Sequence, residues 1–191
     1  GGGVTVSPTV TVNAGNSTIL VNGGAGVINL AGNVLTSSNS ATALRIVNAT
    51  TVDVANLTTG TAGGTTTLGT ANNITGAVNQ SGIITTGTLL GSTTSTVNLP
   101  NANVLTSLGA FNANGLTVND STLGLTVTGT LNGGTGATSI TTTGGALALG
   151  TQNVYRVFGS TRRSISPRRR NRIWRRVCAF GATICSSWLW L

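Results

Sequence analysis

The sequence lacks most of the side chains on which enzyme chemistry depends. It contains no histidine, glutamate, lysine or methionine, and its only carboxylate side chains are Asp53 and Asp120. General acid–base and nucleophilic catalysis need positioned groups of these kinds. A phosphate-binding P-loop is excluded because it requires lysine. Calcium-binding β-roll repeats are excluded because the stretches NGGAG and NGGTG contain no aspartate. We therefore expect no enzyme activity and no bound cofactor or metal ion.

The absence of methionine bears on how much of a protein the chain represents. The sequence begins GGGV, without an initiator residue. We expect a fragment or a processed product of a longer parent protein, whose signal peptide cannot be read from this sequence.

Charge and aromatic residues are scarce in most of the chain and concentrated towards its C-terminus. The formal net charge is +8, but nine of the ten arginines, six of the seven aromatic residues and both cysteines lie at or after residue 155. Before that point only Arg45, Asp53 and Asp120 are charged, which gives residues 1–154 a formal charge of −1. The composition therefore predicts two segments, residues 1–154 and an Arg/Trp-rich segment of residues 155–191.

Residues 1–154 carry the alternation that is typical of β-strands. Valine, isoleucine or leucine alternates with threonine or asparagine in VTVSPTVTVN (4–13), TTVDVANLT (50–58) and GLTVTGTLN (124–132). This period of two places the apolar side chains on one face of a strand. Breaks rich in glycine and asparagine follow at short intervals, and no window has a helical period. The segment is therefore predicted to be all-β.

Three blocks of the long segment recur in the same order. INLAGNVLTS (28–37) returns as VNLPNANVLTS (97–107), and LRIVNATTVDV (44–54) returns as LTVNDSTLGL (116–125). The third pair is TAGGTTTLGTANN (61–73) and TTGGALALGTQNV (142–154). These matches align Asp53 near Gly124 and Asp120 near Ala49, so they do not pair the two aspartates. We expect both to be solvated carboxylates in turns or at strand edges.

A repeat of short strands favours a parallel β-helix, in which successive coils stack at about 4.8 Å and enclose a thin core. Valine, isoleucine, leucine and alanine would face inward, threonine, serine and asparagine outward, and glycine and asparagine would take positive φ angles at the corners. Aromatic side chains are too bulky for a uniformly narrow core. Coils of about 20 to 25 residues would give six or seven of them. A β-sandwich and a disordered chain are the alternatives.

Several phrases in the long segment resemble a known family. NITGAVNQSGIITTGTLLGS (73–92), SLGAF (107–111) and LTVTGTLNGGTGATSITTTGG (125–145) are similar to the repeats of filamentous-haemagglutinin-like proteins of two-partner secretion and of autotransporter passengers. The resemblance covers about residues 15–154. It implies a β-helical stalk from a bacterial exoprotein that crosses the outer membrane unfolded and lacks cysteine.

The stretch SPRRRNRIWRR (166–176) allows three interpretations. In nucleic-acid binding, arginines contact phosphates and Trp174 stacks on a base. In a membrane anchor, the arginines precede the apolar run 177–191, but its 15 residues are fewer than the roughly 20 that span a bilayer. The third interpretation, which we favour, is a frameshift or junction artefact, because the repeat stops abruptly after residue 154.

The short segment supplies all the candidate contacts to an anionic surface. They are Arg168, Arg169, Arg170, Arg172, Trp174, Arg175 and Arg176. Cys178 and Cys185 are expected to be unpaired thiols, because their spacing matches no metal site. Residues 155–191 are expected to stay outside the β-helix as disordered or partly helical chain.

Asn-x-Ser/Thr triplets and threonine rows are weaker signals. Such triplets begin at Asn16, Asn48, Asn56, Asn73 and Asn119, as composition alone predicts in a chain this rich in asparagine and threonine. Flat rows of Thr-x-Thr can bind ice, but these rows have no fixed short period. Outward threonine ladders are the simpler interpretation.

The expected function is therefore non-enzymatic. The resemblance implies a stalk segment of a secreted or surface-displayed bacterial adhesin that acts in adhesion or biofilm formation. The implied partners are a host-cell or abiotic surface and, for the parent protein, an outer-membrane secretion partner. A self-associating structural module without a specific ligand is the alternative, as is membrane-surface or nucleic-acid binding through the short segment; no small-molecule substrate is expected.

Overall fold

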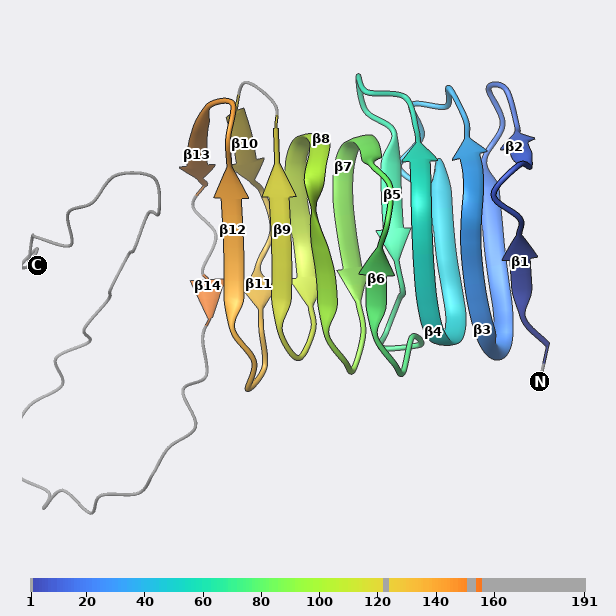
Figure 1. Cartoon of the computed structure of the whole chain (residues 1–191). Coiled ribbons are helices and arrows are strands. Elements are labelled where there is room, and N and C mark those ends of the chain that lie inside the picture. Colours follow the sequence, from blue (N-terminus) through green and yellow to red (C-terminus); the bar gives the residue numbers. More distant parts are fainter. Residues whose placement is uncertain (1, 122–123, 151–153, 156–191) are drawn as a thin grey trace, which may run out of the picture.

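The chain folds into a parallel β-solenoid (Figure 1). The structure is a computed structural model that describes residues 2–121 and 124–150 and the backbone of residues 154–155. Among these residues every strand pairing is parallel and no helix occurs. The predicted all-β, parallel β-helical fold is thus confirmed for the described part of the chain.

In the part of the chain that the structure describes, fourteen strands follow one another along the solenoid, and some of them bend around its corners. In chain order they are β1 (Val4–Val6), β2 (Thr11–Asn13), β3 (Ile19–Leu35), β4 (Leu44–Thr58), β5 (Thr65–Leu68), β6 (Val78–Gln80), β7 (Ile84–Ser92), β8 (Val97–Asn112), β9 (Leu116–Asp120), β10 (Gly124–Val127), β11 (Leu131–Asn132), β12 (Thr138–Thr142), β13 (Ala146–Leu149) and β14 (Val154–Tyr155). The last strand pairs with β11 and spans the boundary that the composition predicted after residue 154.

The strand register shows the coils directly. We call residues that occupy the same position in successive coils a column. One column contains Val4, Ile28, Val52, Val78, Val97, Leu116 and Thr138. Its seven positions mark seven coils, and the steps between them are 19 to 26 residues long. The predicted number and length of the coils agree with this register.

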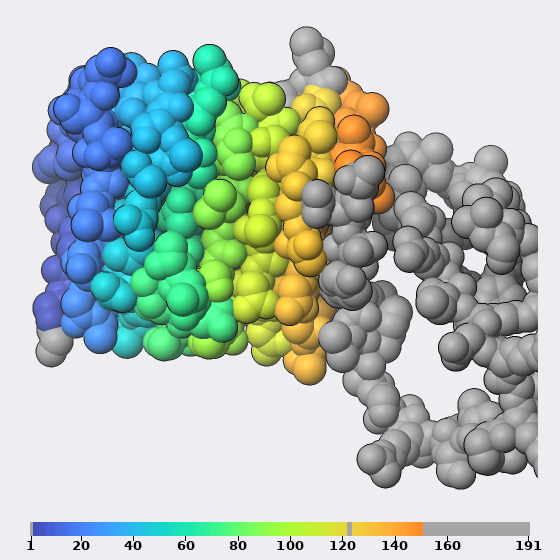
Figure 2. All heavy atoms as spheres, turned by 180° about the vertical axis from the view of Figure 1, so that it is seen from behind, coloured from blue at the N-terminus to red at the C-terminus, as the bar shows by residue number. Residues whose placement is uncertain are grey.

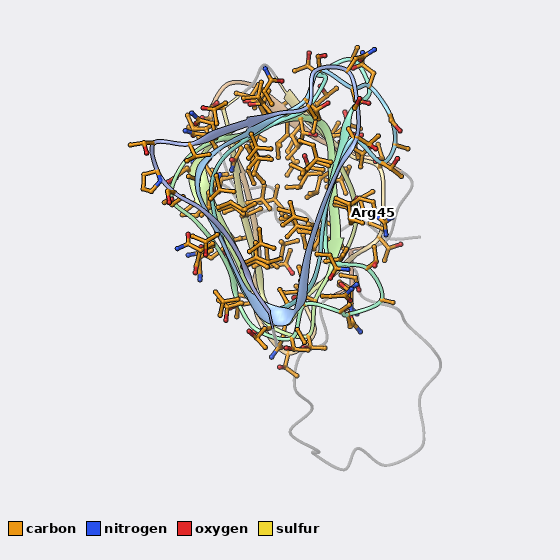
Figure 3. All side chains as sticks on the ribbon, turned by 90° about the vertical axis from the view of Figure 1, so that its right-hand side faces the viewer. Arg45 is labelled. Carbon is orange, nitrogen blue, oxygen red and sulfur yellow. The ribbon has the colours of Figure 1, made fainter. Side chains whose placement is uncertain are left out.

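Inward and outward positions alternate as the sequence pattern predicts. In β9, Leu116 and Val118 are buried, whereas Thr117 and Asn119 are partly exposed. Seen along the stack, the backbone encloses a narrow interior filled by side chains (Figure 3). In sequence order the coils follow one another from one end of the molecule to the other (Figure 2), so each coil packs on its neighbours.

The predicted block matches are only partly correct. Ile28 and Val97 share a column and lie three coils apart, as the first match predicts. The second match is wrong, because Leu116 belongs to this same column and not to that of Leu44. The third is shifted by two residues, since Thr66, not Leu68, shares a column with Leu149. Coils of unequal length prevent a single offset from holding along the chain.

Phe111 lies in the core despite its size. Among the described residues it is the largest fully buried side chain, and its column contains Leu68, Gly91 and Leu131. A Cβ atom at Gly91 would lie 2.6 Å from the Phe111 ring. The narrow interior therefore holds an aromatic ring because the preceding coil has no side chain at that position.

Replacing Gly91 by alanine should destabilise the fold. The added Cβ would also lie 2.5 Å from the carbonyl oxygen of Leu68, so a coil must shift, at about 1–3 kcal/mol in the free energy of unfolding. Gly63→Ala is the matched control, because its Cβ meets only the carbonyl oxygen of Asn39, at 3.3 Å. Urea unfolding followed by circular dichroism measures both. Equal stability of the two variants would contradict this packing.

Thr66 is a polar side chain in an otherwise aliphatic column. The column contains Leu44, Thr66, Leu89, Leu108 and Val127. Thr66 is fully buried, and its hydroxyl oxygen has no hydrogen-bond partner among the described residues. A buried hydroxyl without a partner has lost its hydration without compensation.

Thr66→Val should therefore stabilise the protein, by about 1 kcal/mol in the free energy of unfolding. Thr86→Val is the control, because Thr86 is also fully buried but its hydroxyl bonds the Thr59 hydroxyl at 2.7 Å and donates to the Gly64 carbonyl at 3.0 Å. That variant should lose stability. Thermal unfolding shows whether each variant is more or less stable than the unmodified chain. A lower melting temperature for Thr66→Val would contradict this prediction.

Candidate functional site

The two aspartates lie on opposite sides of the solenoid wall. Asp53 faces outward, is partly exposed, and accepts a hydrogen bond of 2.9 Å from the side-chain amide of Asn79. Asp120 is fully buried, and its Oδ1 accepts a bond of 3.0 Å from the backbone N–H of Leu105. The expectation that Asp120 is solvated is therefore wrong, because its column places it next to Asn103, inside the coil.

The two aspartates lie in different columns, as the sequence predicts. The block alignment on which that prediction was based is nevertheless wrong. Asp53 shares its column with Thr117, three residues before Asp120 in the same coil, and not with the neighbourhood of Gly124. The one described arginine, Arg45, lies between Leu20 and Thr67 on an outward column (Figure 3). Among the described residues no three His, Cys, Asp or Glu side chains group to hold a metal ion.

A polar cluster occupies one inward column where aliphatic residues are expected. The column starts at the exposed Val12 and runs through Val34, Leu57 and Ile84, which are fully buried or nearly so. It continues with Asn103 and Asp120. Sequence reasoning missed this cluster, because the alignment of 28–37 with 97–107 matched Asn103 with Asn33. In the structure Val104 occupies the column of Leu35, so Asn103 turns inward.

Asn103 uses its whole carboxamide inside the wall. Its Oδ1 accepts hydrogen bonds from the side-chain amide of Gln80 and, at 2.9 Å, from the backbone N–H of Ile84. Its Nδ2 donates to the carbonyl oxygens of Asn101 and Asn119, both at 2.9 Å. The side chain thus joins three successive coils where the backbone ladder is irregular, which is a structural role.

An outward column of polar side chains, all neutral except Asp53, runs through all seven coils. We call it the outer polar column; its members are Thr5, Asn29, Asp53, Asn79, Asn98, Thr117 and Ser139. Five of these side chains are exposed, and Asp53 and Thr117 are partly exposed. Hydrogen-bonding groups therefore repeat along this face at the coil spacing of about 4.8 Å.

A hollow lies at one corner of the solenoid, where coils of different length meet. The first coil has three residues, 23–25, between Asn22 and Gly26, where the second has only Asn48. The third coil has five residues, 69–73, before Ile74, where the second has two before Ala49. The second coil is therefore recessed between two longer corners, which leaves a space of about 360 Å³.

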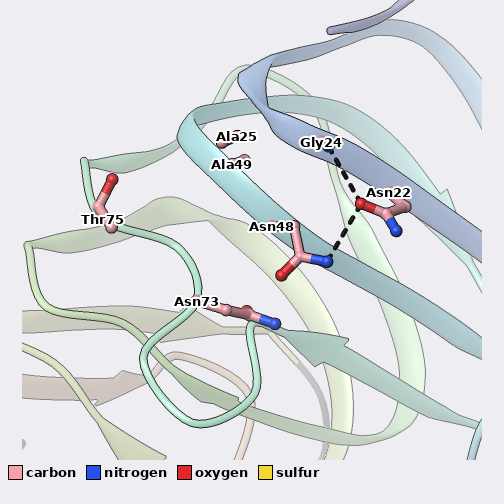
Figure 4. Close-up of a pocket in the computed structure, with 7 residues that line it drawn as sticks. All are labelled: Asn22, Gly24, Ala25, Asn48, Ala49, Asn73 and Thr75. Atoms are coloured by element: carbon pink, nitrogen blue, oxygen red, sulfur yellow. Dashed lines mark hydrogen bonds between the residues drawn. The ribbon is translucent and has the colours of Figure 1, made fainter. Parts of the chain in front are cut away.

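Seven residues line this corner hollow (Figure 4). They are Asn22, Gly24, Ala25, Asn48, Ala49, Asn73 and Thr75. Asn48 and Gly24 have positive φ angles, as the sequence predicts for asparagine and glycine at corners, and Ala25 shares this conformation without having been foreseen. One sequence pattern could have indicated the hollow. Asn22, Asn48 and Asn73 follow one another at steps of 26 and 25 residues, close to the length of a coil.

The Asn-x-Ser/Thr triplets, interpreted above as a consequence of composition, fall in different environments. Asn16, Asn48 and Asn56 are exposed, and Asn73 and Asn119 are partly exposed. Asn73 bonds Thr70 through both atoms of its amide, and Asn119 donates to the Pro100 carbonyl at 3.1 Å. Most of these asparagines thus have roles in ladders and corners. Their presence needs no modification to explain it.

The candidate anionic-surface contacts from Arg168 to Arg176, including Trp174, lie outside the described residues, as do Cys178 and Cys185. Within the described part, no helix is long and apolar enough to cross a membrane. In comparisons with known proteins, no protein-family model, no curated protein and no solved structure matches the chain.

Replacing Asn103 by alanine should be strongly destabilising. The variant leaves the N–H of Ile84 and the carbonyls of Asn101 and Asn119 without this partner in a buried site, at a cost of about 2–4 kcal/mol. Asn98→Ala is the control, because Asn98 is exposed and should change stability by less than about 0.5 kcal/mol. Chemical unfolding measures both. Equal losses would show that the cluster is not structural.

Proposed function

We propose that the chain is a non-enzymatic stalk segment of a secreted or surface-displayed bacterial adhesin, and that the outer polar column is its adhesive face. The observation that carries this proposal is the continuity of that column through seven coils. A rigid scaffold holds one polar side chain of this column at each coil, and six of the seven are neutral hydroxyl or amide groups that can both donate and accept hydrogen bonds. Single hydrogen bonds at an exposed site are weak, but a row that engages one surface together gains affinity by multivalency.

The charge of the described residues indicates which surfaces this face fits. Arg45, Asp53 and Asp120 are the charged side chains in this part, and only Asp53 belongs to the outer polar column. Attraction to the surface therefore depends little on ionic strength. A neutral, hydroxyl-rich surface, on a host cell or on an abiotic material, is the partner that amide and hydroxyl groups suit best.

The resemblance of residues 73–92 and 125–145 to filamentous-haemagglutinin-like proteins supports the bacterial setting. A parent of this kind would be exported with an outer-membrane secretion partner and would use these coils to hold its binding regions away from the cell. A parallel solenoid suits this role, because the backbone hydrogen bonds of each coil are made to its neighbours and the rod can be long.

A self-associating structural module is the second candidate. The apolar side chains Val4, Val6 and Ile19 in the first coil and Ile140 and Leu147 in the last are only partly buried against the core. β1 and β2 pair on one side only, with β3. Such strand edges can pair with another copy of the chain.

The adhesive proposal predicts that removing amides from the outer polar column weakens attachment. Beads carrying residues 1–191 should adhere to hydroxylated glass and to epithelial cells. Asn29→Ala/Asn98→Ala should lower the retained fraction several-fold, since about 1 kcal/mol is lost per hydrogen bond. The control is Thr58→Ala/Thr85→Ala, which alters a different outward column. Bead retention under flow measures all three proteins.

Two further arms separate the alternatives. A chain that ends at Tyr155 should keep its attachment, whereas loss of attachment together with loss of DNA retention would assign binding to residues 156–191. Light scattering of the unmodified chain tests self-association. Retention no greater than that of uncoated beads, or equal losses in the two double variants, would reject the outer polar column as an adhesive face.

A further inference from the structure

We propose that the corner hollow is a binding site for one ring of a neutral saccharide. This proposal rests on the proposed function, because saccharide binding would serve adhesion. It names the ligand class of a second site on the same solenoid, separate from the outer polar column. Its geometry is independent of the outer polar column. The hollow is formed by a specific difference in corner length between the first three coils.

Polar groups around the hollow are held in place by bonds to one another. The Oδ1 of Asn22 accepts from the backbone N–H of Gly24 at 3.0 Å and from the amide of Asn48 at 3.2 Å (Figure 4). Asn73 is fixed through Thr70, whose backbone N–H donates to Asn73 Oδ1 at 2.9 Å and whose hydroxyl accepts from Nδ2 at 3.1 Å. The rim therefore loses little conformational freedom when a ligand binds.

Three polar groups at the hollow remain available after these bonds are made. They are the Nδ2 donor of Asn22, the Oδ1 acceptor of Asn48 and the hydroxyl of Thr75, none of which has a hydrogen-bond partner among the described residues. All three side chains are exposed. One donor, one acceptor and one group that does both match the mixed donor and acceptor character of adjacent sugar hydroxyls.

The other ligand classes fit this lining poorly. Among the described residues no charged side chain lines the hollow, so an anion or cation has no counter-charge. Three amide oxygens, two of which already accept hydrogen bonds within the protein, are too few for a calcium ion. Ala25 and Ala49 are its only apolar side chains, so an apolar ligand would bury little surface. The floor is a recessed corner and not a strand edge, which excludes addition of an extended peptide as a further strand.

Backbone strain at the rim agrees with a site that is kept for binding. Ala25 has a φ of 64° and Asn48 a φ of 55°. An L residue in this region is under conformational strain, and for alanine no side-chain hydrogen bond compensates. The Ala25 conformation is part of the longer first corner, which forms one wall of the hollow.

The test is a titration of the ¹⁵N-labelled chain, residues 1–191, with glucose, galactose, mannose and N-acetylglucosamine. Glucuronate and glucosamine serve as charged counterparts. We expect at least one neutral sugar to shift the side-chain amide signals of Asn22 and Asn48, with a Kd on the order of 1 mM. The amide of Asn56, which belongs to a ladder elsewhere, should not move. Charged counterparts should bind no better than the neutral sugars.

Asn48→Gly removes the carboxamide and tolerates the positive φ, and it should weaken sugar binding roughly tenfold. Asn72→Gly is the matched control, because Asn72 has a φ of 61°, accepts hydrogen bonds from Ser92 and Asn112, and does not line the hollow. Thr75→Val is the second variant. If circular dichroism shows that Asn48→Gly is unfolded, sugar binding by Thr75→Val tests the site by itself.

Loss of binding in Asn48→Gly and Thr75→Val, with binding kept in Asn72→Gly, supports the site. The proposal is overturned if no neutral sugar shifts Asn22 or Asn48, if only a charged sugar does so, or if all variants weaken binding equally. Its failure is distinguishable from failure of adhesion: Asn29→Ala/Asn98→Ala leaves the hollow intact and tests attachment, whereas Thr75→Val leaves the outer polar column intact.

Discussion

Parallel backbone hydrogen bonding between successive coils is the interaction on which the rest of this structure depends. No coil can enclose a core alone, because a single turn of strand has an open edge on each side. Once the coils stack in register, each column repeats one environment at about 4.8 Å. A buried position such as that of Val52 is then flanked by two more buried positions, and an outward asparagine such as Asn79 is flanked by outward polar groups.

The same constraint explains where the solenoid tolerates exceptions. Phe111 is accommodated because Gly91 stands in its column one coil earlier. Asn103 is tolerated inside the wall because its carboxamide bonds groups in three coils, where an unsatisfied amide would be strongly destabilising. Each exception is resolved by an adjacent coil, so the effects of a substitution in this architecture should be sought one coil away as well as at the substituted residue.

The sequence predicted those features that depend on alternation and composition, and failed where register decides. Alternating valine and threonine predicted the strands, and their recurrence predicted stacked coils of the observed number and length. Matching by phrase misplaced Leu116 and left Asp120 on the surface, since insertions of one or two residues at corners change which column a residue joins. A shift of one residue reverses inside and outside, which is why Asn103 and Asp120 were not recognised as buried.

Unequal corners also explain how a uniform rod acquires distinct places on its surface. Identical coils would give only continuous columns, such as the outer polar column, and those suit repeated weak contacts. A short coil between two longer ones breaks the continuity and makes a recess, as Asn48 does between the corners of Gly24 and Asn73. The stacking hydrogen bonds fix the columns, while the corners are free to vary in length. A continuous polar face and a distinct recess can therefore arise on one scaffold from different parts of the same coil.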